Sequence, residues 1–316
     1  MGPLLFLVYI NDLPNISKIL DFYLFADDTN IYLEDDSLQN LEKKINKELH
    51  SLYLWLSVNR LSLNIDKTNF VIFHPFNKPL KYNVTIKINK KAICEKKFIK
   101  YLGVLIDSTL SWNHHVFQLS KKLSRAVGIL YKLRPFVNAK IMKSVYYALF
   151  YSHVVYAIEV WGSANETILT TIAILQKRII RLITYKDQFP LIPGPLIHSS
   201  PLFGELGILK IKDVFVLQIS KFIHKCVNSN IIGNFDKWFI LNFEVHSHRT
   251  RSNYNYSKMS YTNNLFIPFG RTTNYGLKLI KVSGPKIWNN LPLDLRNIKS
   301  FSNFKNSIKN HLIGFY

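Results

Sequence analysis

A pair of adjacent aspartates between two short apolar runs constrains the fold of this chain more than any other feature. Residues 22–25 (Phe-Tyr-Leu-Phe) and 31–33 (Ile-Tyr-Leu) are rich in aromatic and β-branched side chains, which is typical of strands. The intervening residues 26–30 read Ala-Asp-Asp-Thr-Asn, and Asp and Asn are favoured turn residues. The pattern predicts a β-hairpin that carries Asp27 and Asp28 at its turn.

The hairpin is predicted to belong to a small α+β unit. Apolar residues at steps of three or four predict an amphipathic helix over residues 38–56, with Asp36 or Ser37 as its N-cap. Residues 4–13 fit either the end of a helix or a buried strand, because periodicity does not separate the two. The further predicted strands span residues 69–74, 84–88 and 98–106.

After Trp112 the hydrophobic period becomes helical. The predicted helices span residues 116–133, 139–161, 166–185, 213–227 and 300–313. The longest apolar stretch, residues 144–164, contains Glu159, so a buried helix explains it better than a membrane span. The proline-rich residues 190–201 predict a loop. Residues 242–275, rich in Asn, Ser, Tyr and Arg, predict a long loop or a segment that orders on binding to a nucleic acid strand.

Basic residues outnumber acidic residues and are unevenly placed along the chain. Lys and Arg number 41 and Asp and Glu 20, which gives a formal net charge of +21. Residues 1–75 carry a net charge of −4, whereas residues 76–316 carry +25. This excess predicts a polyanionic partner, either nucleic acid or an anionic membrane surface. An acidic head can hold cations and a basic body can hold phosphates, although drift in a Lys- and Asn-rich chain would give the same split.

The cysteine and histidine content restricts the chemistry further. Two cysteines, Cys94 and Cys226, exclude a disulfide framework and a four-cysteine zinc module. We therefore expect an intracellular protein, in the nucleus or the cytoplasm, with no disulfide-linked partner. The histidine pairs at 114–115 and 246/248 lack a third ligand at a suitable spacing. No segment is a better membrane anchor than the basic helices, so we expect no membrane partner.

The residues around the predicted hairpin resemble the reverse transcriptases of non-LTR retrotransposons. The most specific part is residues 2–14 (Gly-Pro-Leu-Leu-Phe-Leu-Val-Tyr-Ile-Asn-Asp-Leu-Pro), followed closely by residues 25–29 (Phe-Ala-Asp-Asp-Thr). The softer matches are residues 61–64 with Lys67 and Thr68, residues 100–104 with Ile106 and Asp107, residues 175–178, and residues 284–292. The resemblance therefore covers nearly the whole chain.

The resemblance implies an α+β fold with a partial polymerase palm followed by a mainly helical thumb and C-terminal region. The palm, an antiparallel sheet with helices, would span residues 1–110 and include the catalytic hairpin and primer-grip-like strands. A helical thumb-like region would span residues 111–190. A C-terminal region of helices and loops would span residues 191–316.

The resemblance also implies roles for individual residues. Asp27 matches the metal-binding carboxylate of the catalytic hairpin, and Asp28 its neighbour with a smaller or indirect role. Lys67 matches a basic residue thought to protonate the leaving pyrophosphate, although a solvated surface lysine fits the position equally well. Tyr101 and Gly103 would lie at the primer grip, or simply in a core strand. The thumb-like residues that would hold duplex phosphates are Lys121, Lys122, Arg125, Lys177, Arg178 and Arg181.

For the intact parent enzyme, the resemblance implies template-primed DNA synthesis by two-metal nucleotidyl transfer. The cofactor would be two Mg²⁺ ions, with Mn²⁺ as an alternative. The partners would be an RNA template, a DNA primer and deoxynucleoside triphosphates.

The family's palm carries a further metal-binding aspartate on an earlier strand, upstream of the motif in which this sequence begins. The fingers and the Gln-Gly run before that motif are also absent from these 316 residues. We therefore expect the chain alone to be an inactive part of an RNA-directed DNA polymerase. The alternatives are a non-catalytic module that binds RNA or RNA–DNA duplex, and a non-functional transposon remnant.

Overall fold

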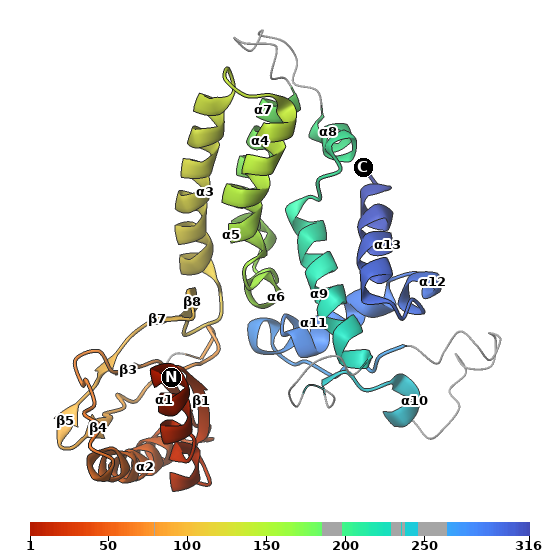
Figure 1. Ribbon diagram of the computed structural model, residues 1–316. Coiled ribbons are helices and arrows are strands. Elements are labelled where there is room, and N and C mark those ends of the chain that lie inside the picture. Colours follow the sequence, from red (N-terminus) through yellow and green to blue (C-terminus); the bar gives the residue numbers. More distant parts are fainter. Residues whose placement is uncertain (79, 185–197, 229–234, 236–237, 246–263) are drawn as a thin grey trace. The chain divides into compact units, whose positions relative to one another are not determined.

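The computed structural model describes residues 1–316 except 79, 185–197, 229–234, 236–237 and 246–263 (Figure 1). The chain divides into two compact units, Met1–Ile99 and Lys100–Tyr316. Each unit has its own hydrophobic core. The units are therefore described separately.

The first unit combines two helices with short paired strands. Its elements are α1 (Gly2–Ile10), the 3₁₀ helix η1 (Leu13–Ile16), β1 (Asp21–Phe25), β2 (Asp28–Tyr32), α2 (Leu38–Val58), β3 (Asn69–Phe70), β4 (Lys87–Ile88), β5 (Lys91–Ala92) and β6 (Cys94–Glu95). Strands β1 and β2 pair antiparallel, as do β4 and β5, whereas β3 and β6 pair parallel. The segment that fitted a helix or a strand is thus helical, as α1.

Helix α2 confirms the helix predicted over residues 38–56. Ser37 is its N-cap and has an extended backbone, with φ −126° and ψ 128°. Ile45, Leu49 and Leu52 are buried, which places one apolar stripe of the helix against the core of the first unit. The Asn46 amide then joins α2 to the segment leading into β4, because its Nδ2 donates to the Thr85 carbonyl at 3.0 Å and its Oδ1 accepts from the Lys87 N–H at 2.7 Å.

Two of the predicted strands are much shorter than expected. Residues 69–74 and 84–88 contain only the two-residue strands β3 and β4. Pro75 follows the first of these segments, and its carbonyl closes a turn with the Lys78 N–H at 2.9 Å. A proline has no N–H to donate to a ladder, so the pairing of the first segment cannot continue into this turn.

The second unit begins with a hairpin and continues as a layered helical body. The hairpin consists of β7 (Phe98–Tyr101), which spans the division between the units, and β8 (Val104–Asp107). The helices are α3 (Asn113–Leu133), α4 (Ala139–Tyr146), the π-helix η2 (Tyr147–Tyr151), α5 (Ser152–Val155), α6 (Ile158–Trp161), α7 (Glu166–Thr184), α8 (Ser199–Leu206), α9 (Ile211–Val227), α10 (Asn242–Val245), the π-helix η5 (Thr273–Leu277), α11 (Ile280–Asn289), α12 (Leu293–Arg296) and α13 (Phe301–Ile313).

The helix predicted over residues 139–161 is wrong as a single element. It is divided into α4, η2, α5 and α6, and it breaks at Tyr156, which is extended with ψ 115°, and at Ala157, which has φ +51°. Tyr156 forms hydrogen bonds that offset the break. Its hydroxyl donates to the Leu102 carbonyl at 2.5 Å, and its own carbonyl accepts from Trp161 Nε1 at 2.9 Å.

Helices α3 and α7 pack against each other. Helix α9 packs against α11 and α13 (Figure 1). Trp161 and Trp288 are among the largest buried side chains of this core. The buried amide of Gln176 on α7 links three segments, because its Nε2 donates to the Tyr146 hydroxyl and the Leu209 carbonyl, at 3.0 and 2.8 Å. Its Oε1 accepts from the Ile211 N–H at 3.1 Å, at the start of α9. Among the helices of the described residues, none has the length and apolar character needed to cross a membrane.

Candidate catalytic hairpin and nucleic-acid interface

The predicted hairpin is confirmed and holds its two aspartates at the turn. Phe25 pairs with Asp28, so the loop between the strands consists of Ala26 and Asp27 alone. Ala26 has a positive φ of 50°. Two-residue hairpin loops favour positive φ because their twist then matches that of the strands. Asp27 therefore sits in the loop itself, and Asp28 is the first residue of β2.

The two faces of the hairpin differ in burial. Phe22 and Leu24 pack against the core of the first unit, while Tyr23 and Phe25 are 57% and 59% exposed. Cross-strand partners share a face, so Asp28 lies on the exposed face opposite Phe25. The core thus fixes the inner face of the hairpin and leaves the aspartate side outside.

Both carboxylates are available to an external cation. Asp27 and Asp28 are exposed, and neither side chain forms a hydrogen bond or ion pair within the described residues. Carboxylate oxygens are the ligands that Mg²⁺ prefers. The set is partial, however, because no group of three or more His, Cys, Asp or Glu side chains in the described part of the chain could hold an ion. Further ligands would have to come from another segment or from substrate phosphates.

Lys67 lies in an exposed turn with a fixed backbone. The Asn64 side-chain oxygen accepts from the Lys67 N–H at 3.2 Å, and the Thr68 hydroxyl donates to the Asn64 carbonyl at 2.8 Å. No hydrogen bond or ion pair within the described residues joins Lys67 to Asp27 or Asp28. The structure therefore presents Lys67 to solvent and does not bring it into contact with the aspartates.

Tyr101 and Gly103 lie at the turn of the β7–β8 hairpin. Leu102 and Gly103 form its two-residue loop with φ +44° and +84°. Two positive φ angles are what a type I′ turn requires. Tyr101 is half-buried and Gly103 is exposed, so the loop is presented at the surface of the second unit while Tyr156 holds the Leu102 carbonyl. Sequence reasoning missed Tyr156, because no local pattern links it to a turn 54 residues away.

Asp107 connects this hairpin to α3 and was also missed as a positioning residue. The residue is 5% exposed. Its carboxylate accepts from the N–H and hydroxyl of Thr109, at 3.1 and 2.7 Å, and from the N–H groups of Ser111 and Trp112, at 2.9 and 2.8 Å. Burial raises the pKa of Asp107, but these hydrogen bonds outweigh it and hold the pKa below its usual value. The signal was available in the Asp-Ser-Thr sequence before the helix.

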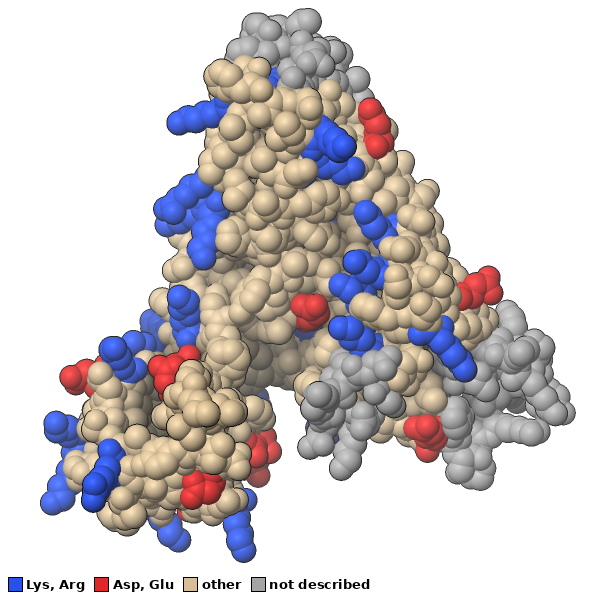
Figure 2. All heavy atoms as spheres, in the orientation of Figure 1, with Lys and Arg blue, Asp and Glu red and all other residues tan. Residues whose placement is uncertain are grey.

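The predicted basic residues of α3 are exposed. Lys121, Lys122 and Arg125 project away from the buried stripe of that helix. Lys121 Nζ lies 4.3 Å from the centre of the Phe117 ring. Helix α3 contains no Asp or Glu, and Figure 2 shows Lys and Arg side chains along it. The exposed side of the helix therefore carries positive charges and no negative charge.

Helix α7, which packs on α3, carries the other predicted phosphate contacts. Lys177 and Arg178 are exposed, and Arg181 is half-buried. The buried stripe of α7, which includes Ile172 and Ile179, faces the shared core. Both basic sets are thus carried by one rigid helical pair. The segment suggested for single-strand contact and the 246/248 histidine pair fall mostly within residues 246–263, outside the described residues.

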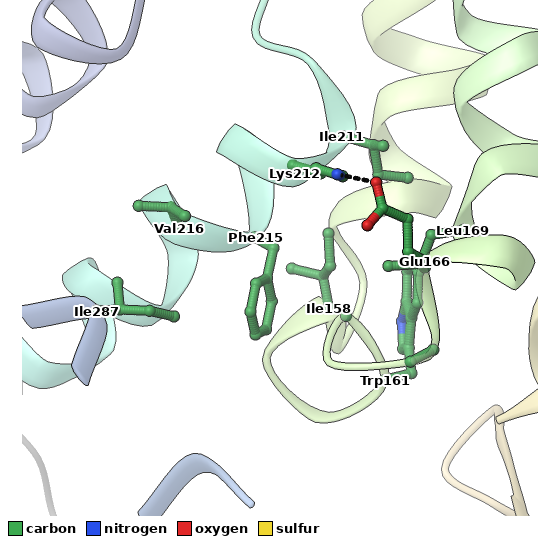
Figure 3. A pocket seen from close by; sticks show the side chains of 11 residues that line it. Ile158, Trp161, Glu166, Leu169, Ile211, Lys212, Phe215, Val216 and Ile287 are labelled. Atoms are coloured by element: carbon green, nitrogen blue, oxygen red, sulfur yellow. Dashed lines mark hydrogen bonds and ion pairs between the residues drawn. The ribbon is translucent and has the colours of Figure 1, made fainter. Parts of the chain in front are cut away.

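A pocket of about 260 Å³ in the second unit contains none of the predicted site residues. Its lining is mainly apolar, with Phe215 and Ile287 on one side and Trp161 on another, and the ion pair of Lys212 with Glu166 closes one edge (Figure 3). Its composition suits packing more than phosphate chemistry.

Comparison with curated proteins confirms the resemblance that the motifs indicate. The chain is similar to RNA-directed DNA polymerases of non-LTR retrotransposons. It is 25% identical over 198 residues to the probable RNA-directed DNA polymerase from transposon X-element of Drosophila melanogaster, covering 60% of this chain and 21% of that protein. It is 22% identical over 240 residues to the RNA-directed DNA polymerase from mobile element jockey of Drosophila funebris, covering 73% and 25%.

A third relative, the probable RNA-directed DNA polymerase from transposon BS of Drosophila melanogaster, is 26% identical over 199 residues, covering 58% of this chain and 21% of that protein. The chain thus matches a quarter or less of the length of these relatives. No family model matches the chain, and no solved structure matches it.

Proposed function

We propose that this chain supplies part of an RNA-directed DNA polymerase, with part of the palm in its first unit and a thumb in its second. The observation that carries the proposal is the placement of Asp27 and Asp28 at the exposed tip of a hairpin anchored in a core. Similarity to RNA-directed DNA polymerases over 60% and 73% of the chain supports it.

The chemistry of the hairpin suits nucleotidyl transfer. Phosphoryl transfer depends on positioning and on neutralising charge as it develops. Asp27, with Asp28 beside it, would hold a divalent ion, Mg²⁺ or Mn²⁺, and such an ion lowers the barrier by stabilising charge on the attacking and leaving oxygens. Because the inner face of the hairpin is buried, the carboxylates would be held in place without rearrangement of the strands.

The second unit would hold the RNA template and DNA primer. The basic faces of α3 and α7 suit contacts to phosphates, which position a duplex without reading its sequence. The β7–β8 turn, with Tyr101 and Gly103, would lie near the primer end. Lys67 would act as a proton donor to pyrophosphate only if the bound substrate brought it into reach.

The partial ligand set leads to a sharper proposal, that the chain alone does not extend a primer. Two carboxylates from one hairpin do not by themselves fix both ions and an incoming nucleotide. The test supplies the purified chain with an RNA template, a DNA primer, deoxynucleoside triphosphates and Mg²⁺ or Mn²⁺. We expect no extension. Metal-dependent extension that is lost in Asp27→Ala but kept in the matched surface variant Asp66→Ala would overturn the inactivity and establish the catalytic role.

Binding to a primer–template junction tests the thumb independently of catalysis. Fluorescence anisotropy would compare an RNA–DNA junction with a blunt duplex of equal length. We expect the chain to bind the junction more tightly than the blunt duplex. The affinity of a Lys121→Gln/Arg125→Gln/Arg178→Gln variant should depend less on salt than that of the wild type. A matched variant, Lys43→Gln/Lys47→Gln/Lys91→Gln, removes equal charge from the first unit. Equal effects of both variants would contradict a specific duplex surface.

The second candidate function is a non-catalytic module that binds RNA or RNA–DNA duplex. The observation that favours it is the exposed side of α3, which carries lysines and an arginine but no acidic residue. Such a module would bind the junction and the blunt duplex equally well, and Asp27→Ala would leave its binding unchanged.

A further inference from the structure

Five lysines from three helices of the second unit form a chain of neighbours, each within electrostatic reach of the next. They are Lys143 on α4, Lys221 and Lys225 on α9, and Lys305 and Lys309 on α13. We call them the α9–α13 lysine cluster. None of them belongs to the phosphate contacts predicted from the sequence.

Helix geometry aligns the two lysine pairs. Lys221 and Lys225 are four residues apart on α9, as are Lys305 and Lys309 on α13, so each pair shares one face of its helix. Each step of four residues advances about 6 Å along the helix. The lysines therefore form short rows on two helices that pack together.

Side-chain contacts at both ends show that α9 and α13 run antiparallel. Lys225, near the end of α9, places its Nζ 4.8 Å from the ring centre of Phe301, the first residue of α13. At the other end, the Tyr316 hydroxyl accepts from the Lys210 N–H at 2.8 Å and donates to Asp213 at 2.5 Å. Lys221 consequently lies near Lys305, with Lys225 toward the Phe301 end of α13 and Lys309 toward its other end, so the two pairs form one staggered line. Figure 2 shows Lys and Arg side chains gathered over α9 and α13.

The lysines act on one another electrostatically. Burial lowers the pKa of Lys221, the charges of Lys305 and Lys225 lower it further, and the Glu159 carboxylate of α6 opposes them. Burial likewise lowers the pKa of Lys309, and the charges of Lys143 and Lys305 add to the effect. Repulsion of this kind opposes folding and is relieved when an anion lies across the groups.

Two of the five ammonium groups are held by hydrogen bonds. Lys221 Nζ donates to Gln218 Oε1 at 2.8 Å, and Lys143 Nζ donates to the Leu206 carbonyl. Four of the five side chains are half-buried, and Lys305 is exposed. Because burial and hydrogen bonds already restrict part of the cluster, a bound anion costs less side-chain entropy than it would on fully exposed lysines.

We propose that the α9–α13 lysine cluster binds the phosphate backbone of a nucleic acid strand, in addition to the surface formed by α3 and α7. A staggered line of charges, from Lys225 through Lys221, Lys305 and Lys309 to Lys143, suits a series of phosphates better than a single anion. The proposal does not depend on the polymerase function, because it uses no residue of the hairpin, α3 or α7.

The test measures the affinity of the full chain for a single-stranded RNA of about 20 nucleotides, a length that allows several phosphate contacts, by anisotropy at several salt concentrations. The cluster variant is Lys221→Gln/Lys305→Gln/Lys309→Gln, and the control variant is Lys281→Gln/Lys286→Gln/Lys299→Gln. The control removes equal charge from exposed positions of the same unit. A third variant, Lys221→Arg/Lys305→Arg/Lys309→Arg, keeps the charge.

We expect the cluster variant to raise Kd at least about tenfold and to make the slope of log K against log salt shallower by about 2, since each phosphate contact to a single strand contributes about 0.7. The control and arginine variants should bind nearly as tightly as the wild type. Equal losses in the cluster and control variants would overturn the proposal, since they would indicate bulk charge alone. It would also be overturned if the cluster variant lost binding to anionic phospholipid vesicles while its RNA affinity stayed unchanged.

A thermal melt of each variant separates a loss of RNA binding from a loss of folding. Removing mutually repelling charges should leave the Tm of the cluster variant unchanged or higher, so weaker RNA binding would not reflect unfolding. This test is separate from the test of the thumb-like surface. That surface is tested by preference for the junction and by substitutions in α3 and α7.

Discussion

Gly103 is held in a backbone conformation that other residues adopt only with strain. Its φ is +84°, and an added Cβ would lie 3.4 Å from Tyr156 Cε1. We expect Gly103→Ala to lower the free energy of unfolding of the second unit by about 1 kcal/mol. Gly128→Ala is the matched control, because Gly128 lies within α3 with open space around it and should gain about 0.5–1 kcal/mol.

Urea unfolding followed by circular dichroism would measure both glycine variants. The change in the free energy of unfolding should be negative for Gly103→Ala and positive for Gly128→Ala. A Gly103→Ala variant as stable as Gly128→Ala would contradict the strained turn.

His115 makes the stability of the second unit depend on pH. Its Nδ1 accepts from the Leu105 N–H at 3.3 Å, which requires an unprotonated nitrogen. Burial, with the charge of Lys122 adding to it, lowers the pKa of His115 to about 4. Because the folded pKa lies below that of the unfolded chain, the neutral ring stabilises the fold fully above about pH 6.5, and this contribution is lost as the pH falls to about 4.

Unfolding measured between pH 7 and pH 4 tests the role of His115. We expect the free energy of unfolding to fall by at most about 1.4 kcal/mol per pH unit from this single proton. The fall should be smaller in His115→Gln, whereas the exposed neighbour His114→Gln should follow the wild type. Identical profiles for His115→Gln and the wild type would contradict the assignment.

At the scale of elements, Asp107 determines how α3 begins. Its buried carboxylate accepts four hydrogen bonds from Thr109, Ser111 and Trp112. We expect Asp107→Ala to destabilise the second unit by about 2–4 kcal/mol, since it leaves buried N–H groups without an acceptor. Asp107→Asn keeps one acceptor oxygen, so its free energy of unfolding should lie between those of the wild type and Asp107→Ala. Chemical denaturation would measure the series, and an alanine variant within about 0.5 kcal/mol of the wild type would show that water replaces the carboxylate.

Elements whose fold is decided by their own periodicity could be predicted from the sequence. Helices α2, α3 and α7 each bury one apolar stripe, and the aspartate hairpin follows from its turn residues. The break at Tyr156 could not be predicted, because it depends on a hydrogen bond to Leu102, far away in the sequence. Strands β3 and β4 are much shorter than predicted. Their segments contain strand-forming residues, but few residues elsewhere pair with them.

The candidate sites also differ in whether neighbouring residues or the packing of distant segments bring their side chains together. Asp27 and Asp28 are neighbours in the sequence, so their shared position was predictable. The lysines of α4, α9 and α13 meet only through packing, so their cluster was not. Their i, i+4 spacing was visible in the sequence, but a helix with such a pair usually presents it to solvent.

At the scale of the whole molecule, the two cores should respond separately to substitution. Leu52 is buried in the core of the first unit and Leu123 in that of the second. Each Leu→Ala variant should lower the stability of its own unit by about 2–5 kcal/mol through lost burial and the cavity left behind. Of the five tryptophans, Trp55 alone lies in the first unit, so its fluorescence can be separated from that of the others.

Denaturation of the wild type, the two leucine variants and their Trp55→Phe counterparts would test this. Leu52→Ala should shift the transition reported by Trp55 and leave the other transition in place. Leu123→Ala should do the reverse. A single transition, moved equally by both variants, would mean that the cores unfold together, and charge changes in one unit could then alter the other. The binding tests of α3, α7 and the lysine cluster would in that case need the stability of each variant to be matched before affinities are compared.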